Sequence, residues 1–352
     1  MDAVIDKIRE LWERKAFRVL AYVLFGFVSF FVFLMATFPK HRVTEIATVQ
    51  LEAALGHEYD VNIGNIGLWR LTGLRLRDVN LRERVGPDAD ELSGPPRVVQ
   101  IDRISGRVAP LRSVFSLGLV VHGQVDIGGG GLINGYYTLS GGEQKVEVST
   151  KDLDLRQSTL LAGLLGVPLF GQIDADVELE LNPQGGVRQG EIVVAARQLT
   201  LGATTVRSEQ IPVFTELDLP TTSFGNLRAR IVFEELDAAR GASRMTFEEF
   251  QTQGGRDISL QLWGHVDLLP GSGRPRLQMR MQLSQEYVTE NSLGFLLNMQ
   301  DFRNGLFESW YGFVFAGTFD NLQFEGSTQA ARGPSEDLPR EDDGAEAEAP
   351  EE

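Results

Sequence analysis

An unbroken apolar run near the N-terminus, Val19–Phe38, constrains this chain more than any other feature. The run is 20 residues long and carries no charge. A helix of that length measures about 30 Å, which matches the hydrocarbon core of a bilayer. Pro39, Lys40 and Arg42 follow at once and end the run. It predicts a transmembrane helix at residues 19–38, with the rest of the chain held against one face of a membrane.

A cleaved signal peptide is the competing interpretation of this run. Its apolar core usually covers about 7–15 residues and ends in a small-x-small cleavage site. Residues 35–39 read Met-Ala-Thr-Phe-Pro, which fits such a site poorly. An uncleaved anchor is therefore favoured.

Basic residues are more numerous before the apolar run than directly after it. Those after it are Lys40 and Arg42, and those before it are Lys7, Arg9, Arg14, Lys15 and Arg18. The positive-inside rule places the N-terminus in the cytoplasm and the body on the other side. Residues 1–18 form a short amphipathic cytoplasmic segment, with apolar side chains at helical spacing: Ile5, Ile8, Leu11 and Trp12.

A second helical pattern follows Pro39. Its apolar residues recur at helical spacing and make one stripe: Val43, Ile46, Ala47, Leu51, Ala54 and Leu55. Gly56 provides a stop signal. Residues 39–56 are therefore predicted to form an amphipathic linker helix between the membrane and the body.

From residue 57 to residue 328 the apolar period changes to two, which is typical of strands with one covered face. Ile173–Leu181 is the clearest case, and Leu74–Leu81 shows a slip in parity that predicts a bulge or kink. Glycine-rich turns separate the strands, so an antiparallel arrangement is expected. Asp237–Phe250 and Ser292–Met299 read as partly helical. The fold class is mainly β: an extended, curled antiparallel sheet that forms an open trough, a sandwich or a barrel.

Charge and cysteine content exclude several classes of function. The chain has 352 residues, no cysteine and a formal net charge of −16. Disulfides, thiolate zinc sites and cysteine nucleophiles are thus absent, and broad nucleic-acid binding is disfavoured. Residues 329–352 are predicted to be a disordered acidic tail, because Gly333–Glu352 holds nine acids, one base and almost nothing apolar. A solubilising role is favoured for this tail over an acidic docking arm.

No catalytic signature emerges from the residues. The sequence contains no nucleophile elbow and no Walker loop, and Gly128–Gly135 is better explained as a hairpin turn than as a phosphate loop. The acids Asp174, Asp176, Glu178 and Glu180 are predicted to line a solvated strand face. The histidines are scattered, with His122 and His265 expected on strands, and the pairs Glu234-Glu235 and Glu248-Glu249 are expected on the surface. We therefore predict no catalytic, metal or cofactor site and no enzyme activity.

The order of short motifs resembles a known family. The apolar run ends in Phe38-Pro39, the linker helix ends in Leu55-Gly56, and four further motifs follow: Val61–Gly64, Leu71–Val79, Gly135–Gly142 and Leu153-Asp154-Leu155 before Gly171–Asn182. Over residues 19–326 this looks like the GspN component of bacterial type II secretion systems. The anchor, the helix and the early strands also resemble the wider AsmA-like proteins, whose long sheets are thought to form lipid-conducting grooves.

The resemblance implies a single-pass inner-membrane protein of a Gram-negative bacterium with a periplasmic body, GspN-like over residues 57–328. It implies a role in protein export through contacts with other secretion subunits. A lipid-binding groove is the alternative, lined by leucine and methionine: Leu179, Leu181, Leu260, Leu262, Met279 and Met281. A cryptic hydrolase remains a third and remote hypothesis, which a strongly shifted pKa in a small pocket would revive.

Overall fold

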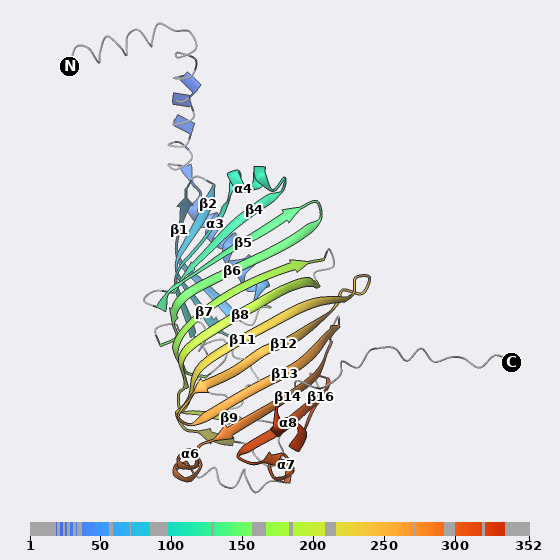
Figure 1. Ribbon diagram of the computed structural model, residues 1–352. Coiled ribbons are helices and arrows are strands. Elements are labelled where there is room, and N and C mark those ends of the chain that lie inside the picture. The colour runs from blue at the N-terminus through green and yellow to red at the C-terminus, as the bar shows by residue number, and fades with distance from the viewer. Residues whose placement is uncertain are drawn as a thin grey trace, which may run out of the picture. The chain divides into compact units, whose positions relative to one another are not determined.

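The computed structural model describes residues 37–55, 59–70, 72–84, 98–127, 130–156, 167–182, 186–207, 216–269, 272–291, 300–318 and 321–334, with scattered positions from 19 to 33. The chain divides into two compact units, Met1–Gly166 and Val167–Glu352. Each is predominantly antiparallel β-sheet (Figure 1). The mainly β class predicted from the period-two pattern is therefore confirmed.

In the N-terminal part of unit 1, the structure describes scattered positions from 19 to 33 and the continuous stretch 37–55. Residues 1–18 and most of Val19–Phe38 lie outside the described residues. Among the positions that are described, no helix has both the length and the apolar character that crossing a bilayer requires. The linker helix is present as α3 (Lys40–Ala54), which starts directly after Pro39.

Six strands of unit 1 follow one another as an antiparallel meander, so each strand pairs with the next one along the chain. A short helix, α4 (Pro110–Phe115), connects the third and fourth strands. The strands are β1 (Tyr59–Trp69), β2 (Gly73–Glu83), β3 (Val98–Val108), β4 (Leu119–Asp126), β5 (Leu132–Ser140) and β6 (Glu143–Asp154). The pairing of β4 with β5 confirms the hairpin turn expected at Gly128–Gly135.

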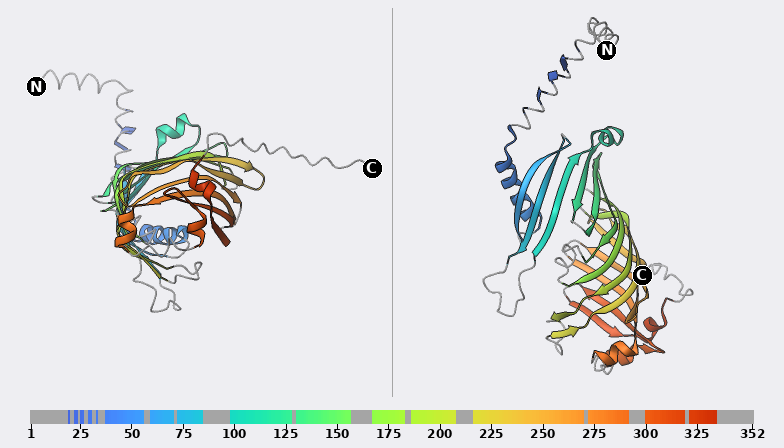
Figure 2. Two further views of the ribbon diagram at one scale, coloured as in Figure 1. Left: turned by 60° about the horizontal axis from the view of Figure 1, so that its bottom comes forward. Right: turned by 90° about the vertical axis from the view of Figure 1, so that its left-hand side faces the viewer.

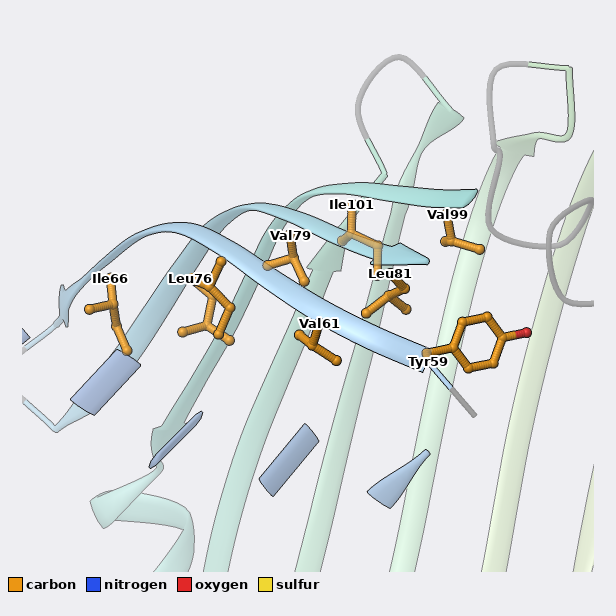
Figure 3. Close-up of a cluster of buried hydrophobic side chains, with 9 residues drawn as sticks. Tyr59, Val61, Ile66, Leu76, Val79, Leu81, Val99 and Ile101 are labelled. Carbon is orange, nitrogen blue, oxygen red and sulfur yellow. The ribbon is translucent and has the colours of Figure 1, made fainter. Parts of the chain in front are cut away.

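Helix α3 packs against the apolar face of β1–β3. The buried side chains of these three strands form the core of this part of unit 1 (Figure 3). Val79 and Val99 are completely buried in this core. Four of the six residues predicted for the apolar stripe pack against this core, at spacings of four residues: Val43, Ala47, Leu51 and Leu55. Ile46, which was also predicted for the stripe, is exposed. In this part of unit 1, a helix rather than a second sheet hides the apolar strand face.

The parity slip predicted in Leu74–Leu81 is confirmed as a kink in β2. Asp78 adopts a left-handed conformation with φ +54°, so Leu76 and Val79 both point into the core although they are three residues apart (Figure 3). The neighbouring strand accommodates the kink with Gly64, where a Cβ atom would lie 2.9 Å from the Cβ of Asp78. The glycine thus leaves room for the unusual backbone beside it.

The direction of α3 is set by two contacts at its C-terminal end. Glu52 accepts a hydrogen bond from the backbone N–H of Val61 and forms an ion pair with Arg84 at 3.2 Å. The end of α3 therefore lies beside the start of β1. Since α3 has 15 residues and is about 22 Å long, its first residue, Lys40, lies toward the other end of β1.

Unit 2 is also one antiparallel sheet, with a small separate hairpin. Its strands pair in the order β7-β8-β11-β12-β13-β14-β16, with β15 and β17 also paired to β16, while β9 pairs with β10. The bounds are β7 (Leu169–Leu181), β8 (Val187–Leu201), β9 (Thr204–Arg207), β10 (Glu216–Leu219), β11 (Thr222–Asp237), β12 (Ala242–Gly254), β13 (Ile258–Leu269), β14 (Ser272–Leu283), β15 (Leu306–Phe307), β16 (Trp310–Thr318) and β17 (Asn321–Gly326). Short helices α6 (Gln285–Glu290), α7 (Gln300–Asn304) and α8 (Thr328–Arg332) complete it.

The prediction of partial helix at Asp237–Phe250 is wrong. Asp237 ends β11 and accepts hydrogen bonds from the backbone of Ala239 and Arg240, which makes a tight turn closed by Gly241 at φ +64°. The chain then continues as β12, which pairs with β11 on one side and β13 on the other. Pairing on both edges outweighs the helix propensity of the short Ala-Ala-Arg segment. Ser292–Met299 lies outside the described residues.

The folded part of unit 2 extends past the boundary expected at residue 328. Helix α8 spans that position, and Ala330 and Ala331 are buried against the sheet. Arg280 of β14 donates a hydrogen bond to the carbonyl oxygen of Arg332. Residues 335–352, most of the predicted acidic tail, lie outside the described residues.

Candidate binding surface

One face of the unit 2 sheet carries apolar side chains on every long strand, and we call it the apolar face. The strand register places Val177, Ile192, Ile231 and Phe247 side by side across four neighbouring strands. A second row crosses the next three strands: Leu262, Met279 and Phe313. Because side chains alternate along a strand, these residues all point to the same side.

The six residues predicted to line a groove all belong to unit 2, but only four are brought together. Leu260 lies opposite Met281 and Leu262 opposite Met279, on the adjacent strands β13 and β14. Leu179 is on the apolar face of β7, several strands away. Leu181 follows a register shift between Glu180 and Leu181 at the end of β7.

The apolar face is only partly shielded from water. Val266 and Phe313 are buried, whereas the six predicted residues are all half-buried. Helices α7 and α8 contact the strands β14, β16 and β17 at one side of the sheet. Among the described elements, no helix makes comparable contact with the central strands β8, β11 and β12. A half-exposed apolar surface of this extent is a candidate site for an apolar ligand or partner.

The side chains of the apolar face define what it can bind. They are aliphatic, aromatic and thioether groups, which adapt to an extended hydrocarbon as well as to an apolar protein surface. Sequence reasoning missed the aromatic part of this surface at its β16 edge. There, Phe302 of α7 lies 5.0 Å from Phe313 and 5.8 Å from Tyr311 between ring centres. The even spacing of Tyr311, Phe313 and Phe315 was a usable signal, whereas nothing in the sequence links Phe302 to them.

The opposite side of β7 is the polar face predicted for its four acids. Asp174 pairs with Arg197 at 3.3 Å and Glu180 pairs with Arg188 at 2.8 Å, both across to β8, while Asp176 and Glu178 are exposed. Within the described residues, no three histidine, aspartate or glutamate side chains lie close enough together to hold a metal ion. Ion pairing with β8 accounts for two of these carboxylates.

The two histidines predicted on strands are found there, His122 on β4 and His265 on β13. Burial lowers the pKa of His265, and the nearby Arg244 adds to the effect. Burial likewise lowers the pKa of His122, together with Arg107 and Arg112. Nδ1 of His122 and Nε2 of His265 are buried and have no hydrogen-bond partner among the described residues.

The two glutamate pairs lie on the polar side of unit 2 or at its edge. Glu234 and Glu248 are exposed, and Glu248 pairs with Arg230 at 3.3 Å. Glu235 accepts a hydrogen bond from Asn182, and Glu249 accepts one from Gln251. These contacts fit the surface positions expected for all four residues.

The buried carboxylate of Asp257 accepts hydrogen bonds that hold the local structure together. Burial alone would raise its pKa, but hydrogen bonds from the Arg256 side chain and the Ser223 backbone hold the pKa below its usual value. Next to it, the hydroxyls of Thr222 and Tyr287 lie 2.6 Å apart. This network ties α6 to the start of β11.

Comparison with known proteins gives no relative for this chain: no family model, no curated protein and no solved structure matches it.

Proposed function

We propose that this chain is a non-enzymatic, membrane-anchored component of a type II secretion system, similar to GspN, that acts through contacts with other secretion subunits. In this proposal Val19–Phe38 is a single-pass anchor in the inner membrane of a Gram-negative bacterium, residues 1–18 are cytoplasmic, and the body from residue 57 is periplasmic. The absence of cysteine fits such a compartment.

The observation that supports this proposal is the way the resemblance motifs fold. Val61–Gly64 lies in β1, where Val61 and Ile63 belong to the core covered by α3. Most of Leu71–Val79 forms β2, whose Leu76 and Val79 complete the same core. Gly135–Gly142 forms β5 and the turn into β6. Val61–Gly64 and most of Leu71–Val79 therefore lie in the part of the unit 1 meander that α3 covers, and Gly135–Gly142 lies further along the same meander. This arrangement fits a scaffold that presents surfaces to partners.

The test is association within the membrane. Full-length tagged chain is isolated from mildly solubilised inner membranes, and its partners are identified by mass spectrometry. Inner-membrane secretion subunits are expected among them, and deletion of the chain should reduce the export of secreted proteins. Complexes that never contain the chain, together with normal export in its absence, would refute the proposal.

Acyl-chain binding on the apolar face is the second candidate, and the half-exposed row of Leu260, Leu262, Met279 and Met281 favours it. The full-length chain purified in mild detergent is then expected to carry phospholipid detectable by native mass spectrometry. Leu262→Asn with Met279→Asn should lower the bound fraction, whereas Ser259→Asn with Gln278→Asn, on the other side of the same strands, should not. Equal lipid content in both variants would contradict this candidate.

A further inference from the structure

Unit 1 carries a group of cationic and aromatic side chains on the face opposite α3. Ile66 points into the core, so Trp69, three residues further along β1, points away from it. The guanidinium carbons of Arg70, Arg75 and Arg107 each lie 5.6 Å from the centre of the Trp69 ring. Trp69 is only 6% exposed as a result.

Two more rings and a fourth arginine extend this group along the same row. His122 lies 5.8 Å from Trp69 and stacks on Tyr136 at 4.6 Å. The guanidinium of Arg112, from α4, lies 4.0 Å from the centre of the Tyr136 ring. We call Arg70, Arg75, Arg107 and Arg112 the arginine cluster.

The charge of the arginine cluster is poorly balanced. Within the described residues, Arg70, Arg75 and Arg107 form no ion pair with a carboxylate. Glu147 lies 4.0 Å from Arg112, but it is closer to Lys145, at 3.0 Å. Burial lowers the pKa of Arg75, and the positive charges of Arg103, Arg77 and Arg70 add to that effect. An anion placed here would relieve the repulsion.

Within the described residues, several polar atoms of the arginine cluster and its neighbours are buried without hydrogen-bond partners. The Nε atoms of Arg75 and Arg107, Nδ1 of His122 and Oγ of Ser105 have no hydrogen-bond partner in the described part of the chain. Ser105 is only 1% exposed and lies directly opposite Arg75 in the strand register, on the same face. Buried polar groups are normally satisfied, so this set points to a missing acceptor of hydrogen bonds.

An exposed apolar tip adjoins the arginine cluster. Val114 and Phe115 of α4 and Leu117 of the following turn are 71%, 86% and 90% exposed. Leu117 also has a left-handed backbone, with φ +51°, which costs a leucine energy that a glycine would avoid. Three neighbouring apolar side chains held in water, one of them strained, indicate a contact surface.

The apolar tip lies at the end of unit 1 from which the chain leads back toward Val19–Phe38. Helix α3 begins at the Trp69 end of β1, and α4 follows the end of β3 that pairs with the start of β2, also at the Trp69 end. Figures 1 and 2 show α4 at the end of the strands where α3 starts. A membrane reached through residues 19–38 would therefore face the tip.

We propose that this end of unit 1 binds an anionic phospholipid at the membrane surface. The apolar tip enters the acyl region, and the arginine cluster holds the phosphate of the headgroup, to which arginine can donate paired hydrogen bonds. Ser105 and His122 lie on the same face, in neighbouring rows opposite Arg75 and Arg107, and add uncharged hydrogen-bonding groups. This surface differs from the apolar face of unit 2, so the proposal can fail while either function above stands.

The first test measures insertion of the tip. Because the chain has no cysteine, Phe115→Cys gives a single labelling site for an environment-sensitive fluorophore in the full-length protein. Reconstituted into vesicles that contain phosphatidylglycerol, the label should be quenched by spin-labelled acyl chains. Arg82→Cys, exposed at the opposite end of β2, should not be quenched. An unquenched label at position 115 would overturn the proposal.

The second test measures recognition of the headgroup. The full-length chain in detergent is titrated with short-chain phosphatidylglycerol, short-chain phosphatidylcholine or inorganic phosphate. Arg75→Gln with Arg107→Gln should weaken phosphatidylglycerol binding by about tenfold or more, since two charge-assisted contacts are lost. Arg82→Gln with Arg228→Gln, two exposed arginines outside the cluster, should leave it unchanged. Equal affinity for the zwitterionic lipid, or for inorganic phosphate alone, would overturn the assignment.

A third variant separates folding from binding. Leu117→Gly relieves the strained backbone, so it should raise the melting temperature of the full-length chain while reducing the quenching of a label at position 115. A folding defect cannot explain lost insertion in a more stable protein. Unchanged quenching in this variant would show that Leu117 does not contribute to insertion of the apolar tip.

Discussion

Asp78 determines which side chains of β2 face the core of unit 1. Its left-handed backbone lets both Leu76 and Val79 enter the core. Asp78→Val is expected to destabilise the fold by about 1–2 kcal/mol, because a β-branched side chain is strained at positive φ. Asp78→Gly should be neutral or stabilising. Denaturant unfolding of the full-length chain in detergent measures both, with Arg82→Val on the same strand as the control. Equal effects of valine at positions 78 and 82 would contradict this account.

The two half-buried histidines on strands, His122 and His265, predict how stability depends on pH. The pKa of His122 is lowered by burial first and then by Arg107, Arg112 and Arg70, with Glu147 as the nearest acid in its strand row. The pKa of His265 is lowered by burial and Arg244, against the opposing charge of Asp267. The unfolded chain thus binds more protons than the folded chain once pH falls below about 6.5. Stability should therefore decrease as pH falls from that value toward the lowered pKa.

The measurement is the free energy of unfolding between about pH 7.5 and about pH 5.5, the range in which histidine titrates. His122→Gln and His265→Gln should each flatten the decrease, because glutamine takes up no proton. His41→Gln, on the exposed side of α3, serves as the control. A slope that neither strand variant alters would show that other groups cause the pH dependence.

At the scale of single elements, α3 covers the core cluster of unit 1. Leu51 lies in the middle of its packing stripe, against the cluster that contains Val79 and Val99. Leu51→Ala should cost about 2 kcal/mol, near the lower end for buried leucines because Leu51 is only partly buried. Gln50→Ala, exposed on the same helix, should change little. Chemical unfolding followed by circular dichroism distinguishes the two, and equal costs would mean that the stripe does not stabilise unit 1.

The strands and the linker helix were predictable because their signals are local. Alternation marked Ile173–Leu181, the four-residue stripe marked α3, and the parity slip marked the kink at Asp78. Asp237–Phe250 was misread because its structure is decided by pairing with the flanking strands β11 and β13, which the pattern within the segment does not show. Helix α8 was missed for the same reason, since Ala330 and Ala331 become apolar anchors only beside the sheet.

The binding surfaces were less predictable than the strands that carry them. Leu262 and Met279 were named as candidates because they alternate with polar neighbours, and pairing of β13 with β14 does bring them together. Nothing local links Trp69 to Arg107 and His122, because these residues meet only when β1 to β4 pair in register. Clusters built across strands depend on register, which a single strand pattern does not determine.

At the scale of the whole molecule, the position where the folded body ends can be tested by truncation. A chain ending at residue 334 keeps α8 and its hydrogen bond to Arg280, so its melting temperature should match that of the full chain. A chain ending at residue 327 loses both and exposes apolar surface on β16, so it should melt at least several degrees lower. Equal melting temperatures for the two truncations would place the end of the body before α8.

The meander order has a consequence for biogenesis. In unit 1 every described strand pairs with the one made just before it, and in unit 2 β9, β10 and β15 interrupt that order. A nascent polypeptide that emerges from its N-terminus can therefore form most of its sheet one hairpin at a time, without waiting for distant partners. The edge formed by the newest strand is open to mispairing only until the next strand pairs with it.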